Sequence, residues 1–317
     1  MLKKIFMLMV SLGCTYWVCA QESRYLPFLE INPDVRAAAM GNSTMGEARG
    51  MYLYSNPTSL LNEECTKRIY SSYTFAFLPK INDDRERYHA FSAGLRLFDR
   101  HALMVGFRYI GGLSVNAVDA NGNPQSAIKP NDWSIDLAYA FKFNDRWSAY
   151  LGGSFIQSKL DKSSYLMGAN GGVYYKSQCN RCHRASYTLG LGFNNIGGAT
   201  MKAKGISDLK MPGSVSAGGS MALPFNKNHR LNATLSTRYF MIPSSAATLT
   251  TSLGLEYELF NRVAFRTGYF MDGDVSANNY FSMGVGLRCK FGSIDAAYAM
   301  KKNKDFNVIR LGVSFQM

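Results

Sequence analysis

The chain has 317 residues and a formal net charge of +13 at pH 7, and it is rich in glycine (29 residues), phenylalanine (20) and tyrosine (19). After residue 20, no window contains about eighteen uncharged apolar residues, which excludes a membrane-spanning helix of ordinary length. The regular apolar pattern excludes a disordered glycine-rich chain, and glycine combined with aromatic residues favours antiparallel β structure.

Residues 1–20 have the features of a secretory signal peptide: Lys3 and Lys4 precede an apolar stretch, and small residues precede a cleavage position at Gln21. Acylation at Cys14, as in lipoproteins, is an alternative, although Ser11 stands where an aliphatic residue is expected. Export disfavours nucleic acid as a partner. Without Lys3 and Lys4 the net charge is +11. This positive charge is therefore expected to attract an acidic ligand, an acidic partner or a lipid surface.

Residues 21–65 do not follow the strand pattern of the rest of the chain. The stretch 34–50, DVRAAAMGNSTMGEARG, is rich in alanine and has apolar residues at helical spacing. Asn56 and Pro57 mark a turn that ends any preceding helix. A segment of this kind before the first strand is expected to fold into a barrel as a plug.

From about residue 66 to residue 317, apolar residues alternate with small or polar ones, which is the period of a β-strand. The alternation is clearest at the C-terminus, where Ile309 and Leu311 share one face and Arg310 and Gly312 the other. Most segments are close to the ~9–11 residues that a tilted strand needs to cross a bilayer. Fourteen such segments can be counted, near 66–77, 87–98, 102–111, 132–143, 146–158, 165–177, 185–194, 214–223, 229–240, 247–259, 262–271, 279–291, 293–300 and 306–317.

The connections between these segments alternate in length. Short turns are expected at 99–100, 144–145, 179–184, 224–227, 261 and 292. Longer connections are expected at 78–86, 112–131, 159–164, 195–213, 241–246, 272–278 and 301–305. An even strand number with tight periplasmic turns and longer outer loops is typical of outer-membrane barrels. A soluble β-sandwich or propeller is the alternative, but its outward faces would be charged, whereas the non-apolar faces here hold mostly Gly, Ser and Thr. The sequence therefore predicts an all-β fold, a 14-stranded antiparallel transmembrane β-barrel over residues 66–317 with an N-terminal plug segment.

Charged residues fall on the predicted inward faces of the strands. The cations are Arg68, Arg96, Arg108, Lys142, Arg230, Arg238, Arg266, Arg288, Lys290 and Arg310, and the acids are Asp136, Glu256, Glu258 and Asp295. One interpretation is a basic lumen that holds the plug or an anionic group such as a carboxylate, through Arg68, Arg96, Arg108, Arg266, Arg288 and Arg310. The other is a network of ion pairs that fills the barrel, which we favour because charges in a barrel interior must be satisfied.

Cys179, Cys182 and His183 have the C-x-x-C-H spacing of a c-type haem attachment site. Strand-like residues on both sides remove the helix face that would present the three side chains together, so no haem or other cofactor is expected. The ends of a β-turn lie within ~7 Å of each other, which overlaps the separation that a disulfide tolerates. A Cys179–Cys182 disulfide in an oxidising periplasm is therefore predicted, as a marker of one periplasmic hairpin.

Two further patterns could mark metal or catalytic sites. Asp119, Asn121 and Asn123 place oxygens at alternate positions, as calcium loops do, but no acid follows at the far end, so a plain turn and no metal site are expected. No hydrolase or phosphate-loop motif occurs, and we do not expect an enzyme. The histidines are scattered over different segments: His89, His101, His183 and His229.

The stretch 27–61, PFLEINPDVRAAAMGNSTMGEARGMYLYSNPTSLL, resembles the N-terminal signature of the PorV/PorQ family of Bacteroidetes outer-membrane proteins. The likeness continues through 118–125, 131–160 and 254–302, so it covers most of the chain after residue 20. The residues that carry it in the N-terminal stretch are Pro27, Phe28, Leu29, Asp34, Arg36, Ala37, Met40, Gly41, Asn56, Pro57 and Leu60.

The resemblance implies an outer-membrane barrel similar to FadL-type transporters of hydrophobic compounds, with the N-terminal segment inside. It also implies a link with type IX secretion, in which PorV-like proteins bind C-terminal signals of cargo. PorV-like proteins usually have a longer insertion where this chain has only 241–248, MIPSSAAT, so a paralogue with another task stays open. Expected partners are outer-membrane lipid and secreted cargo or secretion components. The alternative is a transporter that passes hydrophobic or amphipathic small molecules laterally through the wall.

Overall fold

The computed structural model describes residues 26–62, 68–81, 84–114, 126–160, 162–179, 185–201, 210–302 and 307–317. Several features singled out in the sequence lie outside these residues. They are the predicted signal peptide, the first residues of the predicted plug, the Asp119–Asn121–Asn123 pattern, and the turn with Cys182 and His183. The side chain of Cys179 is also not described.

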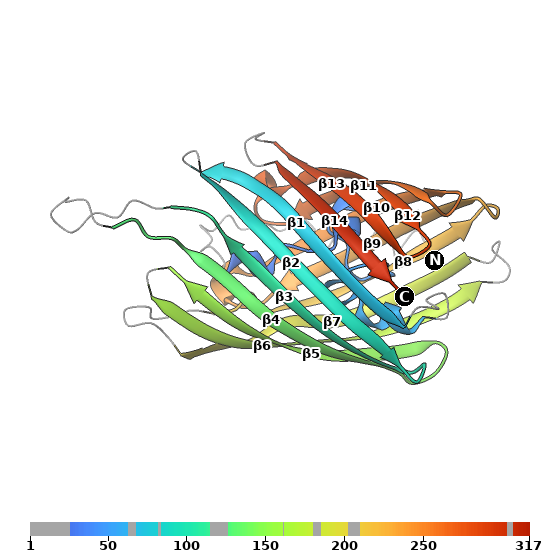
Figure 1. The fold of residues 1–317 in the computed structure, drawn as a ribbon, viewed down its shortest axis with the longest axis horizontal. Helices are drawn as coiled ribbons and strands as arrows, with labels where there is room; N and C mark the ends of the chain where they lie inside the picture. The colour runs from blue at the N-terminus through green and yellow to red at the C-terminus, as the bar shows by residue number, and fades with distance from the viewer. Residues whose placement is uncertain are drawn as a thin grey trace, which may run out of the picture.

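Fourteen antiparallel strands close into one barrel, in which each strand pairs with its neighbours in sequence and β1 pairs with β14 (Figure 1). This confirms the predicted fourteen-stranded antiparallel barrel. The strands are β1 (Ile69–Ile81), β2 (Asp84–Leu97), β3 (His101–Gly111), β4 (Asn131–Lys142), β5 (Trp147–Lys159), β6 (Ser163–Cys179), β7 (Ala185–Met201), β8 (Ser214–Pro224), β9 (His229–Phe240), β10 (Thr248–Leu259), β11 (Val263–Asp272), β12 (Tyr280–Cys289), β13 (Gly292–Lys301) and β14 (Val308–Gln316).

The helical turns in the described part of the chain are all short. They are η1 (Pro27–Leu29), α2 (Val35–Ala39), η2 (Tyr52–Tyr54), η3 (Pro57–Leu61), η4 (Ser244–Ala246) and η5 (Ser276–Asn278). Within the described residues, no helix has the length and apolar character needed to cross a membrane.

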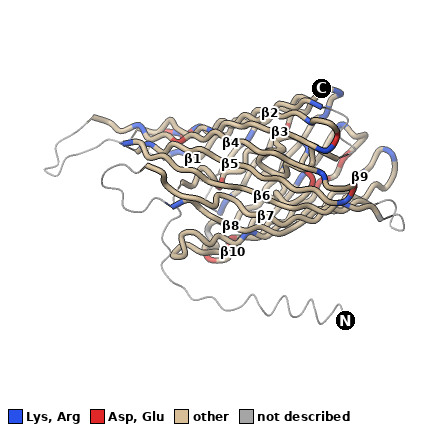
Figure 2. Tube along the Cα trace, turned by 90° about the horizontal axis from the view of Figure 1, so that it is seen from below, with Lys and Arg blue, Asp and Glu red and all other residues tan. Residues whose placement is uncertain are grey.

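The period-two pattern corresponds to the two faces of the barrel wall. Leu311 and Val313 of β14 and Leu103 of β3 are exposed on the outer face, whereas Ala102 and Met104 of β3 are buried inside. In Figure 2 the charged positions gather toward the two ends of the barrel, and most of the strand length carries neither sign. A closed barrel with an apolar outer belt is stable in lipid, so this surface is the one that faces the membrane.

The two ends of the barrel differ in their connections, and we call them the short-turn end and the loop end. The short-turn end carries the turns after β2, β4, β6, β8, β10 and β12, together with the start of β1 and the end of β14. The loop end carries the connections after β3, β7, β9, β11 and β13, and also two brief ones after β1 and β5.

Two of the predicted long connections, at 78–86 and 159–164, were wrong because strand fills most of them, and the one at 195–213 is shortened to 202–213. β1 continues to Ile81 and still pairs with Asp84 of β2, past a register shift after Phe77; Pro79 interrupts the alternation there. β7 continues to Met201, and its Gly197 packs directly against the backbone of β6. Glycines carry no apolar alternation, which is why the sequence pattern ended early. The connection predicted at 159–164 is reduced to 160–162 between β5 and β6.

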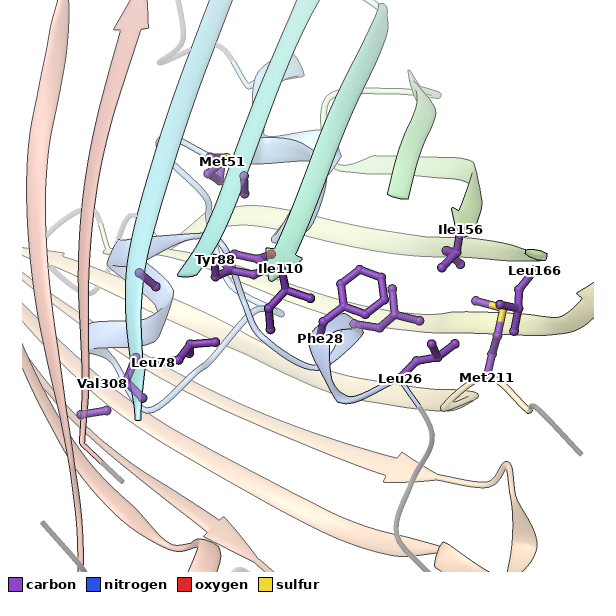
Figure 3. Packing of buried hydrophobic residues seen from close by; sticks show 14 residues of the cluster. Leu26, Phe28, Met51, Leu78, Tyr88, Ile110, Ile156, Leu166, Met211 and Val308 are labelled. Carbon is purple, nitrogen blue, oxygen red and sulfur yellow. The ribbon is translucent and has the colours of Figure 1, made fainter. Parts of the chain in front are cut away.

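Residues 26–62 run through the inside of the barrel, and we call them the interior segment (Figure 1, blue). Helix α2 packs against β11 to β14, and η3 packs against β3 to β5. Leu26 and Phe28 belong to a buried cluster with Ile110 and Ile156 of the barrel wall (Figure 3). The core of the molecule therefore lies between the interior segment and the inner face of the barrel.

Candidate functional site

Asp34 fixes the start of helix α2. Its Oδ1 accepts hydrogen bonds from the backbone N–H groups of Arg36 and Ala37, at 2.9 and 3.3 Å. Its Oδ2 accepts one from the hydroxyl of Ser55, at 2.7 Å. Burial raises the pKa of the Asp34 carboxyl, against the lowering effects of Ser55 and Arg36. This residue therefore caps the helix and joins it to the later part of the interior segment.

Arg36 joins the interior segment to the barrel wall. Its Nε and Nη2 donate to the two carboxylate oxygens of Glu256 at 2.9 and 2.7 Å, and its Nη1 donates to the carbonyl oxygen of Glu47 at 2.5 Å. Burial would lower the pKa of Arg36, but Glu256 raises it above its ordinary value. Glu256 also accepts from Arg266 at 2.6 Å, and Arg266 pairs with Asp295 at 2.6 Å. A buried chain of two arginines and two carboxylates therefore links α2 to β10, β11 and β13.

Gly41 lies directly against the barrel wall. Its φ is 68°, and a Cβ at this position would lie 2.6 Å from the carbonyl oxygens of Leu253 and Tyr269. Its N–H donates to the hydroxyl of Ser282 at 2.9 Å. Only glycine combines a left-handed backbone with so close an approach.

Met40 packs where the wall has no side chains, because a Cβ at Gly254 or Gly268 would collide with it. The helical spacing at 34–50 corresponds to a helix of only five residues, Val35–Ala39. The helix ends before Gly41, whose left-handed backbone lets the chain follow the wall.

Asn56 and Pro57 begin η3. The Oδ1 of Asn56 accepts hydrogen bonds from the N–H and the hydroxyl of Thr58, at 3.1 and 2.7 Å. Its Nδ2 donates to the carbonyl oxygen of Gly46 at 3.0 Å. The turn predicted at this pair thus also holds an earlier part of the interior segment in place.

Glu47 and Arg49 form a charged cluster at the short-turn end that the sequence pattern did not reveal. Glu47 pairs with Lys176 at 3.1 Å and Arg230 at 3.7 Å, and Arg49 pairs with Glu258. Burial would raise the pKa of Glu47, but Arg49, Lys176 and Arg230 lower it to about 2. A cavity of ≈ 240 Å³ opens beside these side chains. The available signal was two opposite charges in a stretch otherwise rich in Ala, Gly and Met.

Arg108 and Asp136 form a second buried pair, in the middle of the lumen. The guanidinium donates to the two carboxylate oxygens at 2.9 and 3.1 Å. The hydroxyl of Tyr54, in η2, donates to Asp136 at 2.9 Å, and the Tyr54 ring centroid lies 4.9 Å from the Arg108 guanidinium carbon. Burial, together with Asp136, raises the pKa of Tyr54 well above its ordinary value, so its hydroxyl stays a donor.

The six arginines predicted to line the lumen are not gathered in one place. Three have carboxylate partners in the barrel, one pairs with a turn residue, one is exposed before β1, and one lines a chamber at the loop end. The three with carboxylate partners are Arg108, Arg266 and Arg288. Arg96 pairs with the turn residue Asp99 at 3.5 Å. Arg68 is the exposed one, and Arg310 lines the chamber. Two other cations expected to face inward lie near turns: Lys142 pairs with Asp145 at 3.4 Å, and Lys290 is exposed.

The loop end of the lumen contains a chamber of ≈ 360 Å³, which we call the loop-end chamber. Its defining residues are Arg238, Lys301, Arg310, Leu78, Phe240 and Phe270. A smaller cavity of ≈ 80 Å³ adjoins it, and Glu30 and Arg238 line both.

The described histidines lie on separate strands, and each is hydrogen-bonded to a tyrosine hydroxyl: His89 to Tyr73, His101 to Tyr139 and His229 to Tyr257. In the described ranges, no group of three or more His, Cys, Asp or Glu residues is placed to hold a metal ion. Cys289 is a free, exposed thiol. The Cys179–Cys182 disulfide stays a prediction.

The family described as "Type IX secretion system protein PorV" matches residues 21–247, which is more than half of the chain. The chain belongs to the PorV family. The match includes the whole interior segment and ends in the connection between β9 and β10, so Glu256 and Arg266 of this PorV-family barrel lie beyond it. A comparison with curated proteins finds no match.

The barrel is also similar to solved structures of toluene transporters and of a FadL homologue. The toluene transporter TbuX of Ralstonia pickettii has a TM-score of 0.57 and 15% identity, over 90% of this chain and 97% of that one. The toluene transporter TodX of Pseudomonas putida has a TM-score of 0.62 and 12% identity, over 89% and 97%. A FadL homologue of Pseudomonas aeruginosa has a TM-score of 0.55 and 13% identity, over 89% and 98%. At these identities the similarity shows the fold alone, and it confirms the expected FadL-like barrel.

Proposed function

We propose that this PorV-family barrel serves type IX secretion as an outer-membrane binding protein for secreted cargo or for a component of the secretion apparatus. The observation that carries the proposal is the interior segment, which is ion-paired to the wall of a secretion-family barrel. The loop-end chamber in the described lumen has a volume of only ≈ 360 Å³. A polypeptide in transit needs far more room, so such a barrel would act by binding rather than by conduction.

The loop end is the binding surface that we propose. It carries the connections between β3 and β4, β7 and β8, β9 and β10, and β11 and β12, which are longer than the turns at the other end. Longer connections face the outside in barrels of this kind, where cargo arrives after crossing the membrane. Binding residues are often carried by loops on a rigid scaffold, and the ion-paired barrel supplies such a scaffold.

Affinity purification tests this proposal. The chain, tagged after Met317 at the short-turn end, would be solubilised from outer membranes in mild detergent and its bound proteins identified. Cargo or a secretion component should be recovered with it, and should not be recovered with an equally tagged, unrelated outer-membrane barrel. Recovery of neither would contradict the secretion role.

A second candidate function is transport of hydrophobic or amphipathic small molecules. It is favoured by the apolar part of the loop-end chamber and by the fold shared with the toluene transporters TbuX and TodX. Transport would require the interior segment to move, whereas binding of cargo at the loops would not.

A cross-link separates the two functions. Ala38 of α2 and Ala297 of β13 belong to one buried cluster, so a cysteine pair at these positions is suited to lock the interior segment to the wall. If the protein is a secretion partner, the locked barrel should support secretion as well as the same variant kept reduced. A transporter should instead lose uptake when locked and regain it on reduction.

A further inference from the structure

Three cations in the loop-end chamber have no carboxylate of the described residues in direct contact. In the part of the chain that the structure describes, neither Arg238, Lys301 nor Arg310 forms an ion pair. The Nε of Arg310 is buried and has no hydrogen-bond partner. Arg238 donates only to two hydroxyl groups, at 3.3 and 3.4 Å. This differs from Arg36, Arg108 and Arg266, which each meet a carboxylate at less than 3 Å.

Among the described residues, the acids that line the chamber, Asp272 and Glu30, form no ion pair with these cations. Asp272 accepts hydrogen bonds from the side chains of Thr248 and Asn278, at 3.2 and 3.0 Å, and its Oδ1 also receives the backbone N–H of Asp274 at 3.3 Å. Its carboxylate therefore organises the connection after β11. Glu30 also lines the chamber and attracts Arg238 electrostatically, without an ion-pair contact.

The remaining wall of the chamber combines apolar side chains with Ser, Thr and Asn side chains. It includes Leu78, Phe240, Phe270 and Val308, and in Figure 3 Leu78 and Val308 lie on neighbouring strands at one side of the buried cluster. A volume of ≈ 360 Å³ falls within the ~300–1,000 Å³ typical of pockets for small molecules. The chamber is thus suited to a compound with an apolar body and an anionic end.

The chamber also contains a buried hydrogen-bond acceptor that has no donor. Asn42 of the interior segment lines the chamber, and its buried Oδ1 has no hydrogen-bond partner. A buried acceptor of this kind costs free energy unless an N–H or O–H group reaches it. A ligand that satisfied both the cations and this oxygen would carry a carboxylate and a nearby donor.

We infer that the loop-end chamber is a binding site for an apolar compound whose polar end carries a carboxylate and an N–H or O–H donor. An N-acyl amino acid is the simplest chemical form of this class. Its carboxylate would accept hydrogen bonds from Arg238, Lys301 and Arg310, its N–H would reach Asn42, and its acyl chain would lie against the apolar part of the wall. A neutral hydrocarbon would leave the three cations without a carboxylate in contact, which is costly in a low-dielectric interior. The inference goes beyond the secretion role and does not depend on it.

Calorimetric titration of the full chain in zwitterionic lipid nanodiscs tests the site with three probes. N-decanoylglycine should bind, and its methyl ester, which lacks the charge, should bind at least about tenfold more weakly. Decanoate, which keeps the charge and lacks the N–H, should bind about threefold to tenfold more weakly than N-decanoylglycine. No binding of N-decanoylglycine, or equal binding of acid and ester, would overturn the site. Equal binding of decanoate would overturn the role of Asn42.

Variants test whether N-decanoylglycine binds in the loop-end chamber. Arg310→Gln should weaken N-decanoylglycine at least about tenfold and leave the ester unchanged, and Arg310→Lys should restore most of the affinity. Arg288→Gln is the matched control, because Arg288 lies at the short-turn end and pairs with Glu258. Unchanged affinity in Arg310→Gln, or an equal loss in Arg288→Gln, would contradict the assignment. The three probes on the unaltered chain decide the question even if a variant does not fold.

Discussion

Arg36 of the interior segment and Glu256 of β10 form a two-point ion pair across 220 positions of sequence. The side chains are 9% and 0% exposed, so the pair is buried on both sides. Removing one partner of a buried pair costs about 3–5 kcal/mol, because the other charge stays behind without compensation. This pair therefore contributes strongly to holding the interior segment in place.

Arg36→Gln should release the interior segment while the barrel remains closed. Hydrogen exchange of the backbone amides in residues 26–62 should accelerate by about two to four orders of magnitude, as expected for the loss of a buried partner. Amides of β3 and β4, on the opposite wall, should keep their protection. Arg68→Gln is the control, because Arg68 is exposed. Unchanged hydrogen exchange in Arg36→Gln would show that other contacts are sufficient to hold the interior segment in place.

Gly41→Ala should displace the same segment by a steric route. The new Cβ would meet two carbonyl oxygens at 2.6 Å in a left-handed backbone conformation. Gly198→Ala is the matched control, since a Cβ there meets nothing within 4 Å. Tryptic cleavage after Arg36 and Arg49 should be fast in Gly41→Ala and slow in both Gly198→Ala and the unaltered chain. Equal resistance in all three would refute this account of position 41.

The charged cluster around Glu47 should make the interior segment acid-sensitive. The pKa of Glu47 is lowered to about 2 in the folded protein, from an ordinary 4.5. A lowered pKa contributes stability that is complete above the unfolded value and is lost as the pH falls through the folded one. The contribution of about 3 kcal/mol should thus disappear between pH 4.5 and 2.

Conductance of the barrel in planar bilayers measures this dependence. The unaltered chain should conduct little at pH 7 and progressively more as the pH falls from 4.5 toward 2. Glu47→Gln should already conduct more at pH 7 and should respond less to acid. The same acid profile in both proteins would mean that Glu47 is not the responsible group.

Peptide mapping tests the Cys179–Cys182 disulfide. In protein that has not been reduced, neither Cys179 nor Cys182 should react with an alkylating reagent until a reductant is added. Cys289 is an internal control, because it is exposed and free and should react at once. Alkylation of all three without reductant would exclude the bridge.

The barrel was predictable because lipid acts on every strand in the same way. Leu311 and Val313 must be apolar on one side of β14, and small residues fit on the other, so the alternation survives in the sequence. The prediction failed where this constraint is absent. Gly197 of β7 packs against backbone, and Pro79 of β1 lies beyond a register shift, so neither carries the alternating signal.

The interior of the barrel was less predictable, because ion pairing depends on which strands face each part of the interior segment. Inward-facing charges such as Glu256 could be listed from the pattern, but its partner Arg36 lies far away in sequence. Glu47 could not be recognised as a buried group, since its partners Lys176 and Arg230 come from two separate strands. The loop-end chamber likewise depends on strand ends that meet only in the closed barrel.

Secretion of cargo is the most direct measurement of the central claim that this barrel works as a type IX secretion partner. Cells that lack the chain would be compared with cells that carry the unaltered chain and the Ala38–Ala297 cross-linked chain, and secreted cargo would be quantified in the medium. We predict that secretion is lost without the chain and restored equally by both forms. Normal secretion in cells that lack the chain would contradict the account.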